Sequence, residues 1–121
     1  MSPYDRPMII GVTTTPHGTV GGGLGRAQVV AVADVRDGEV TSWSEVPVGW
    51  GDLHGIGPEG THHARIVRFV REHSLERVVT SGLGEGMRTT MGKLGVVVRT
   101  DLTGDARTAA VLAATTDAPA T

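Results

Sequence analysis

The dipeptide Asp37-Gly38 constrains the fold of this 121-residue chain more than any other feature. It lies between two strand-like runs, residues 28–35 and 39–48. A type I′ turn needs positive φ at both central residues, so this pair predicts a two-residue β-hairpin. The first run is almost continuously apolar, which favours burial on both faces of a sheet. The second run alternates. We expect one face of it to carry Val40, Ser42, Ser44, Val46 and Val48, and the other Thr41, Trp43 and Glu45.

The rest of the chain alternates between strands and helices. Apolar, β-branched runs predict further strands at residues 8–15, 77–81 and 96–99. One helix is expected from Pro58 to about His73, because proline suits a first helical turn. A second is expected after the glycine turn at 82–86, ending near residue 94 with Gly95 as its C-cap. The last is expected over about 105–114, with Thr103 as its N-cap.

This order of elements predicts the class of fold. Each β-α-β step favours parallel strands joined by a right-handed crossover, whereas the hairpin requires one antiparallel strand. We therefore expect an α/β domain with a mixed five-stranded sheet, one strand antiparallel, and helices covering it. Ligands would bind at the loops beyond the carboxyl ends of the strands. The domain should span 8–114, between a flexible N-terminus (1–7) and a disordered tail (115–121).

Composition excludes several classes of protein. The chain has no cysteine, which rules out disulfides, thiolate zinc sites, cysteine-ligated iron–sulfur clusters and cysteine nucleophiles. A net charge of −2 gives no general electrostatic reason to bind nucleic acid. No apolar run approaches the roughly 20 residues of a membrane helix, and the N-terminus lacks a signal peptide. We therefore expect a cytoplasmic protein that binds neither nucleic acid nor membranes.

Histidines are the best candidates for chemistry. His17 follows the first predicted strand, His54 precedes the first helix, and His62 and His63 lie in its first turns. These four could converge and bind a transition metal through imidazole. Each of them could instead be a helix or surface residue, and no motif such as HExxH supports ligation. His73 suits the helix C-terminus, where the macrodipole favours a cation.

Adjacent helix residues point about 100° apart, so His62 and His63 cannot both face one site comfortably. The stripe formed by Ile66, Val67 and Val70 places His63 inward and His62 toward the rim. His63 is therefore the expected partner of His54 at a buried site. His62 takes that role if the site lies at an exposed edge of the sheet.

A second candidate site is the turn Ser81-Gly82-Leu83-Gly84-Glu85-Gly86, which follows a strand and opens a helix. Backbone N–H groups at such a helix start can bind an anion. The glycines could equally serve only to pack the helix on the sheet. Ser81 has no GxSxG elbow around it, and no paired carboxylates stand out, so we do not expect an enzyme. Met87 and Met91 lie on one helix face and are expected in the core.

Several segments together resemble the dinitrogenase iron-molybdenum cofactor-binding family. They are Gly25-Arg26-Ala27, Asp37-Gly38-Glu39-Val40, the loop HGIGPEG and the stretch SGLGEGMRTTMGKLGVVV, in that order over residues 8–114. The resemblance implies a three-layer α/β/α, ribonuclease H-like fold. Family members include nitrogenase accessory factors that bind or carry the iron–molybdenum cofactor or its precursor.

The resemblance therefore implies a non-catalytic carrier of a metallocofactor or metal cluster. The cargo would be an iron–molybdenum or iron–sulfur type cluster, or a histidine-bound transition metal. Candidate cofactor-binding residues are Arg26, Gly82, Gly84 and Gly86, and candidate metal ligands are His17, His54, His62 and His63. The family often carries His-Phe before Gly-Arg, where this chain has Gly23-Leu24. One family ligand is thus absent unless His17 replaces it.

The sequence offers two alternatives to a carrier. The chain could be a regulatory or interaction domain that binds a small anion, a nucleotide or a protein through its glycine-rich loops. A two-metal hydrolase is disfavoured, because such catalysis needs clustered carboxylates and the first strand, MIIGVTTT, has none. As partners we expect a cofactor-receiving protein and a second copy of the chain, paired through the edge strand at 39–48.

Overall fold

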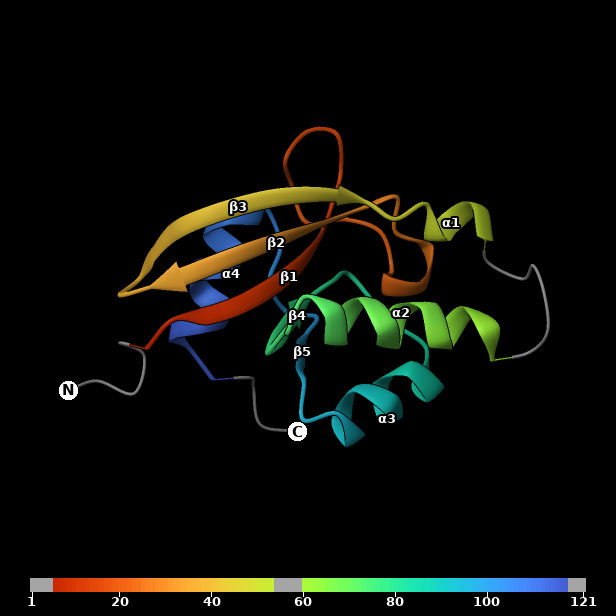
Figure 1. Ribbon diagram of the computed structural model, residues 1–121. Helices are drawn as coiled ribbons and strands as arrows, with labels where there is room; N and C mark the ends of the chain where they lie inside the picture. The colour runs from red at the N-terminus through yellow and green to blue at the C-terminus, as the bar shows by residue number, and fades with distance from the viewer. Residues whose placement is uncertain (1–5, 54–59, 118–121) are drawn as a thin grey trace.

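The computed structural model describes residues 6–53 and 60–117. It is an α/β fold in which five strands form one sheet, in the order β3-β2-β1-β4-β5 (Figure 1). The strands are β1 (Met8–Thr14), β2 (Val29–Arg36), β3 (Glu39–Pro47), β4 (Arg77–Val79) and β5 (Val97–Arg99). The helices are the 3₁₀ turn η1 (Leu24–Arg26), α1 (Trp50–Leu53), α2 (Thr61–Glu72), α3 (Glu85–Lys93) and α4 (Ala106–Thr115). None of these helices is long and apolar enough to cross a membrane.

The predicted hairpin is confirmed. Asp37 and Gly38 have φ values of 52° and 76°, the two positive values that a type I′ turn needs. β2 pairs antiparallel with both β1 and β3, whereas β1 pairs parallel with β4, and β4 with β5. β2 is therefore the single antiparallel strand, as the sequence predicted.

The expected alternation along β3 is wrong at one residue. The pairing shifts between Asp34 and Val35, which face Ser42 and Val40, so Thr41 is an extra, bulged residue. Because of the bulge, the side chains of the β3 residues before Thr41, which are Glu39 and Val40, point to the opposite face from the one that simple alternation predicts. Val40 consequently packs on the same face as Trp43, although the sequence placed it with Val46 and Val48.

Helices cover both faces of the sheet and enclose two apolar clusters. The first lies between the sheet and α4, whose buried residues are all alanines and so allow the helix to pack closely on the strands. Its buried members are Met8, Ile10, Val12, Ala31, Ala33, Val35, Val79, Ala106, Ala109, Ala110, Ala113 and Ala114. The second lies on the opposite face, under α2, α3, η1 and α1. Its buried members are Leu24, Ala27, Val30, Trp50, Ile66, Phe69, Val70, Leu75, Val78, Met87, Met91 and Val96. Met87 and Met91 are thus core residues, as expected.

Helix boundaries differ from the sequence predictions in three places. The sequence missed α1, where Trp50 is 4% exposed and packs edge-on against Phe69. α2 begins after Gly60, and Pro58, its predicted first-turn residue, lies outside the described part of the chain. α4 is capped by Asp105, not Thr103, because the Asp105 carboxylate accepts hydrogen bonds from the backbone N–H and hydroxyl of Thr108. These bonds lower the pKa of Asp105.

Gly95 closes α3 as predicted. It has a φ of 75°, and the N–H of Val96 bonds to the carbonyl of Met91, which is the pattern of a Schellman C-cap.

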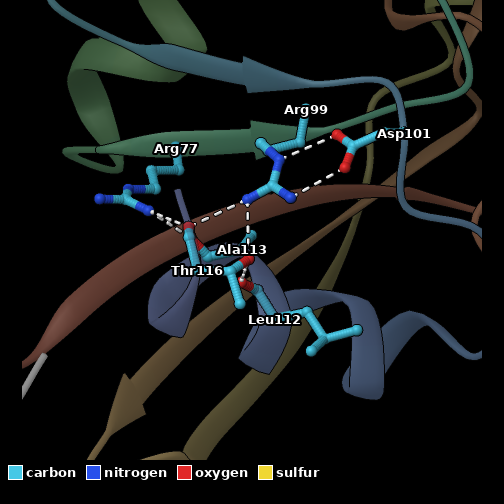
Figure 2. Close-up of polar contacts among 6 residues, drawn as sticks. All are labelled: Arg77, Arg99, Asp101, Leu112, Ala113 and Thr116. Carbon is cyan, nitrogen blue, oxygen red and sulfur yellow. Dashed lines mark hydrogen bonds and ion pairs between the residues drawn. The ribbon is translucent and has the colours of Figure 1, made fainter. Parts of the chain in front are cut away.

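Two arginines hold the C-terminal end of α4 against the sheet (Figure 2). Nη1 of Arg77 donates to the carbonyls of Ala113 and Thr116, at 2.6 and 3.0 Å. Arg99, only 4% exposed, donates through Nη1 to the carbonyl and hydroxyl of Thr116 and forms a two-pronged ion pair with Asp101. Cations here complement the helix dipole and satisfy terminal carbonyls. Thr116, assigned from sequence to a disordered tail, is therefore bound, while residues 118–121 lie outside the described part.

The Arg99–Asp101 pair predicts a pH-dependent loss of stability. The hydrogen bonds from Arg99 lower the pKa of Asp101, so this carboxylate stabilises the fold above the pKa of an unfolded aspartate. That contribution disappears as pH falls through the lowered value. We expect Asp101→Asn to reduce the free energy of unfolding at pH 7 by about 1 kcal/mol, since Asp101 is partly screened by solvent.

Urea unfolding at a series of pH values checks this expectation, with Glu39→Gln at the exposed start of β3 as the control. Wild-type and Asp101→Asn stabilities should converge in acid. A difference that stays constant down to acid pH would contradict the role of the ion pair.

Candidate functional site

A glycine-rich loop, residues 21–26, follows the carboxyl end of β1 and is fixed by the carbonyl oxygen of Gly22. Four groups lie within hydrogen-bond distance of this oxygen: the hydroxyls of Thr13, Thr80 and Ser81 at 3.2, 3.2 and 2.7 Å, and the Ser81 N–H at 3.3 Å. Thr13 and Thr80 are both fully buried. The hydroxyls of these two buried threonines, one in β1 and one directly after β4, therefore connect the loop to the sheet.

A second connection joins the same loop to the turn at 81–86. The N–H of Leu24 donates to the carbonyl of Gly82 at 2.9 Å, and the Thr80 hydroxyl lies 3.2 Å from that carbonyl. Leu24 itself is 2% exposed and packs in the cluster under α2 and α3. The two glycine-rich segments identified from sequence are therefore held side by side.

Two helices begin beside these segments. α2 and α3 have glycine N-caps, Gly60 and Gly84, and neither cap makes a side-chain hydrogen bond to its helix. A Cβ atom added at Gly86 would lie 3.3 Å from Cε1 of His63, so the first turns of the two helices are in contact. At Gly82 and Gly84 an added Cβ would meet nothing within 4 Å. The turn thus presents open backbone at a place where two helix dipoles favour negative charge.

The structure brings His62 and His63 to this place, but their exposures are opposite to those predicted from the apolar stripe. His62 is half-buried, and its Nε2 lies 2.6 Å from the carbonyl oxygen of Gly25. Because a carbonyl oxygen can only accept, Nε2 of His62 is the donor in this hydrogen bond. His63 is exposed, beside Gly86. The buried stripe of α2 consists of Ile66, Phe69 and Val70 and does not include Val67. The inward face of the helix is therefore rotated away from His63, compared with the face that the sequence predicted.

The other predicted ligands do not join this pair in the described part of the chain. His17 is exposed in the loop after β1, where its N–H bonds to the Thr15 hydroxyl and its neighbour Gly18 contacts the start of α4. His54 lies outside the described residues. His73, at the end of α2, packs its ring 4.3 Å from that of Phe69. Among the residues described, no three histidine or acidic side chains are grouped so that they could hold a metal ion.

Arg26 is the last residue of the 3₁₀ turn η1. Its side chain lines a groove of about 420 Å³ together with residues of β1, β2 and β3. The described lining residues are Thr14, Thr15, Pro16, Gly21, Gly22, Arg26, Ala27, Gln28, Val29 and Glu45. Neither the turn at 81–86 nor His62 and His63 are among them. Sequence reasoning missed this groove because its walls come from four separate segments.

Comparison with known proteins supports the fold. The crystal structure of PH0822 superposes with a TM-score of 0.64 at 22% identity, covering 87% of this chain and 86% of the other. An NMR structure described as "a putative NifB protein from Thermotoga (TM1290)", of the DUF35 family, gives a TM-score of 0.61 at 19% identity, covering 84% and 83%. No protein-family model and no curated protein matches the chain. Membership of the cofactor-binding family therefore stays a prediction.

The anchoring of the glycine loop can be tested at Thr80. Thr80→Val keeps the shape of the side chain but removes the hydroxyl that reaches Gly22 and Gly82. We expect the free energy of unfolding to fall by about 1–2 kcal/mol, since a buried acceptor loses a donor. Amide hydrogen exchange at Leu24 and Ser81 should become faster, because these N–H groups form the neighbouring connections.

Thr89→Val is the matched control. It removes an exposed hydroxyl bond to the carbonyl of Glu85 within α3, and should change neither quantity appreciably. Equal behaviour of the two variants would show that the buried hydroxyl does not hold the loop.

Proposed function

We propose that this protein is a non-catalytic carrier that binds an anionic metallocofactor or metal cluster at the contact between the glycine turn and the start of α2. The observation that carries the proposal is the meeting of two glycine-capped helix starts, with open space at Gly82 and Gly84 and the imidazole of His63 beside Gly86. In the same proposal the sheet and its helices form a ribonuclease H-like, three-layer domain.

The available donors favour a preassembled cluster over a single metal ion. An ion held only by protein needs about four ligands, and the described residues offer no group of three. A cluster brings its own internal ligands and negative charge, so one imidazole and several backbone N–H groups would suffice. His63 is the expected direct ligand because it is exposed, whereas His62 is engaged with Gly25 and would position the loop.

The fold comparison agrees with a cofactor-related role without specifying it. One structural neighbour is described as a NifB protein, and at 19% identity the likeness concerns the fold alone. The sequence resemblance adds the iron–molybdenum cofactor, or its precursor, as the expected cargo. Delivery to a cofactor-receiving protein would complete the carrier function.

A second candidate function rests on the same helix starts. Backbone N–H groups at two helix N-termini would also bind a small phosphate-bearing ligand, as a regulatory domain requires. The two functions differ in their need for His63. A phosphate would bind without it, whereas a metal in a cluster would lose a ligand.

Anaerobic binding of isolated iron–molybdenum cofactor tests the carrier function. Gel filtration followed by elemental analysis should show stoichiometric molybdenum and iron on the wild-type protein. His63→Ala should weaken binding at least about tenfold, the loss of one good ligand interaction. Gly82→Ala should also weaken it, because the new methyl group fills space at the turn without meeting any described atom.

His73→Ala and Gly92→Ala are the matched controls. His73 lies at the far end of α2, and Gly92 lies in α3 with open space around it. Both should bind like wild type, and thermal unfolding should show all four variants folded. Cofactor that fails to bind wild type, or binds all variants equally, contradicts the proposal. Stabilisation by inorganic phosphate alone would favour the regulatory function.

A further inference from the structure

The groove lined by Arg26 lies on the face of the sheet that carries α4. Strand alternation fixes this placement: Ile10 and Val12 pack against α4, so Thr14 points to the same side. Glu45 pairs with Ala31, a residue of the α4 cluster, and so also faces that way. α2, α3, His62 and His63 belong to the opposite face, and the groove is therefore separate from the proposed cluster site.

Two opposite charges line this groove without meeting. The guanidinium of Arg26 makes no hydrogen bond or ion pair with any residue in the described ranges. Glu45 is held by the indole N–H of Trp43, which donates to its Oε2 at 3.1 Å. The Trp43 ring is in turn covered by the guanidinium of Arg107, 4.8 Å from the ring centroid. Glu45 is thus oriented, and its other oxygen, Oε1, has no hydrogen-bond donor among the described residues.

We propose that the groove binds a small zwitterion, of which a free amino acid is the simplest kind. Its carboxylate would pair with the guanidinium of Arg26, a planar donor suited to two parallel hydrogen bonds. Its ammonium group would donate to Oε1 of Glu45. The volume of about 420 Å³ lies within the range of small-molecule sites, and the side chain of the ligand would rest on Val29 and Pro16.

The sign pattern argues against a purely anionic occupant. A polyanion would gain from Arg26 but would bring negative charge toward Glu45, which no described cation pairs with. A ligand with both charges satisfies both groups. This is why the groove calls for a different ligand from the glycine turn on the other face, where helix N-termini favour negative charge alone.

Titration of the ¹⁵N-labelled protein with each of the common L-amino acids tests the inference. We expect one or a few of them to shift the backbone amide signals of Gly21, Gly22 and Ala27 at millimolar concentration. Arg26→Met and Glu45→Gln should each weaken binding about tenfold, the value of one charge-assisted hydrogen bond. The matched control, Arg36→Met, removes an exposed arginine at the far end of β2 and should bind like wild type.

Singly charged analogues of the amino acid, together with the variants of each site, distinguish the possible outcomes. The corresponding amines and carboxylic acids, each carrying one charge, should bind more weakly than the amino acid. Carboxylic acids that bind equally well would overturn the zwitterion assignment, as would the absence of any shift or undiminished binding by both variants. His63→Ala should leave amino-acid binding unchanged and Glu45→Gln should leave cofactor binding unchanged, so failure of either proposal leaves the other tested.

Discussion

The carbonyl oxygen of Gly22 is the point on which the glycine-rich segments at one edge of the sheet depend. Hydroxyl groups near the end of β1 (Thr13), directly after β4 (Thr80) and in the turn that follows (Ser81) lie within hydrogen-bond distance of it. β1 and β4 are parallel neighbours, so their carboxyl ends meet at one edge of the sheet. Without these hydrogen bonds, the two glycine-rich segments at this edge, residues 21–26 and 81–86, would have few contacts to hold them in place. Burying two threonine hydroxyls costs free energy unless they are bonded, and a backbone carbonyl between the strands meets that need.

The same loop separates two regions that differ in chemistry. Toward α2 and α3, its Gly25 carbonyl engages His62, and its Leu24 packs in the core beneath. On the other face, its last residue, Arg26, lines the groove on the side of α4. A ligand on either face would contact a segment only a few residues long. Because both contacts share the anchor at Gly22, a shift of the loop caused by one ligand would alter the geometry offered to the other.

Much of the fold could be predicted from sequence because its signals are local. The Asp37-Gly38 turn, the apolar run of β2 and the C-cap at Gly95 each reflect a requirement of a few neighbouring residues. The errors come where distant contacts decide. The bulge at Thr41 is set by the pairing of Asp34 with Ser42 and of Val35 with Val40. The buried stripe of α2, by contrast, has ordinary i, i+3, i+4 spacing once Phe69, which packs against Trp50, replaces Val67 in it. For the candidate site, the sequence singled out the glycine turn and the His62-His63 pair, which the structure places next to each other. It assigned their orientations wrongly, because the carbonyl of Gly25 that engages His62 is 37 residues away.

The hydroxyls around Gly22 also show how this edge could adapt to a ligand. Thr13 and Thr80 have two protons between them, but four acceptor contacts: Thr13 to Gly22 and to Thr80, and Thr80 to Gly22 and to Gly82. Each hydroxyl donates to one acceptor at a time. In one arrangement Thr13 bonds Gly22 while Thr80 bonds Gly82. In the other, Thr13 bonds Thr80, and Thr80 bonds Gly22. Both satisfy the buried donors with the same positions of the heavy atoms. Donors can therefore be redistributed between the glycine loop and the turn at 81–86 by rotation of two hydroxyls, without disturbing the sheet beneath them.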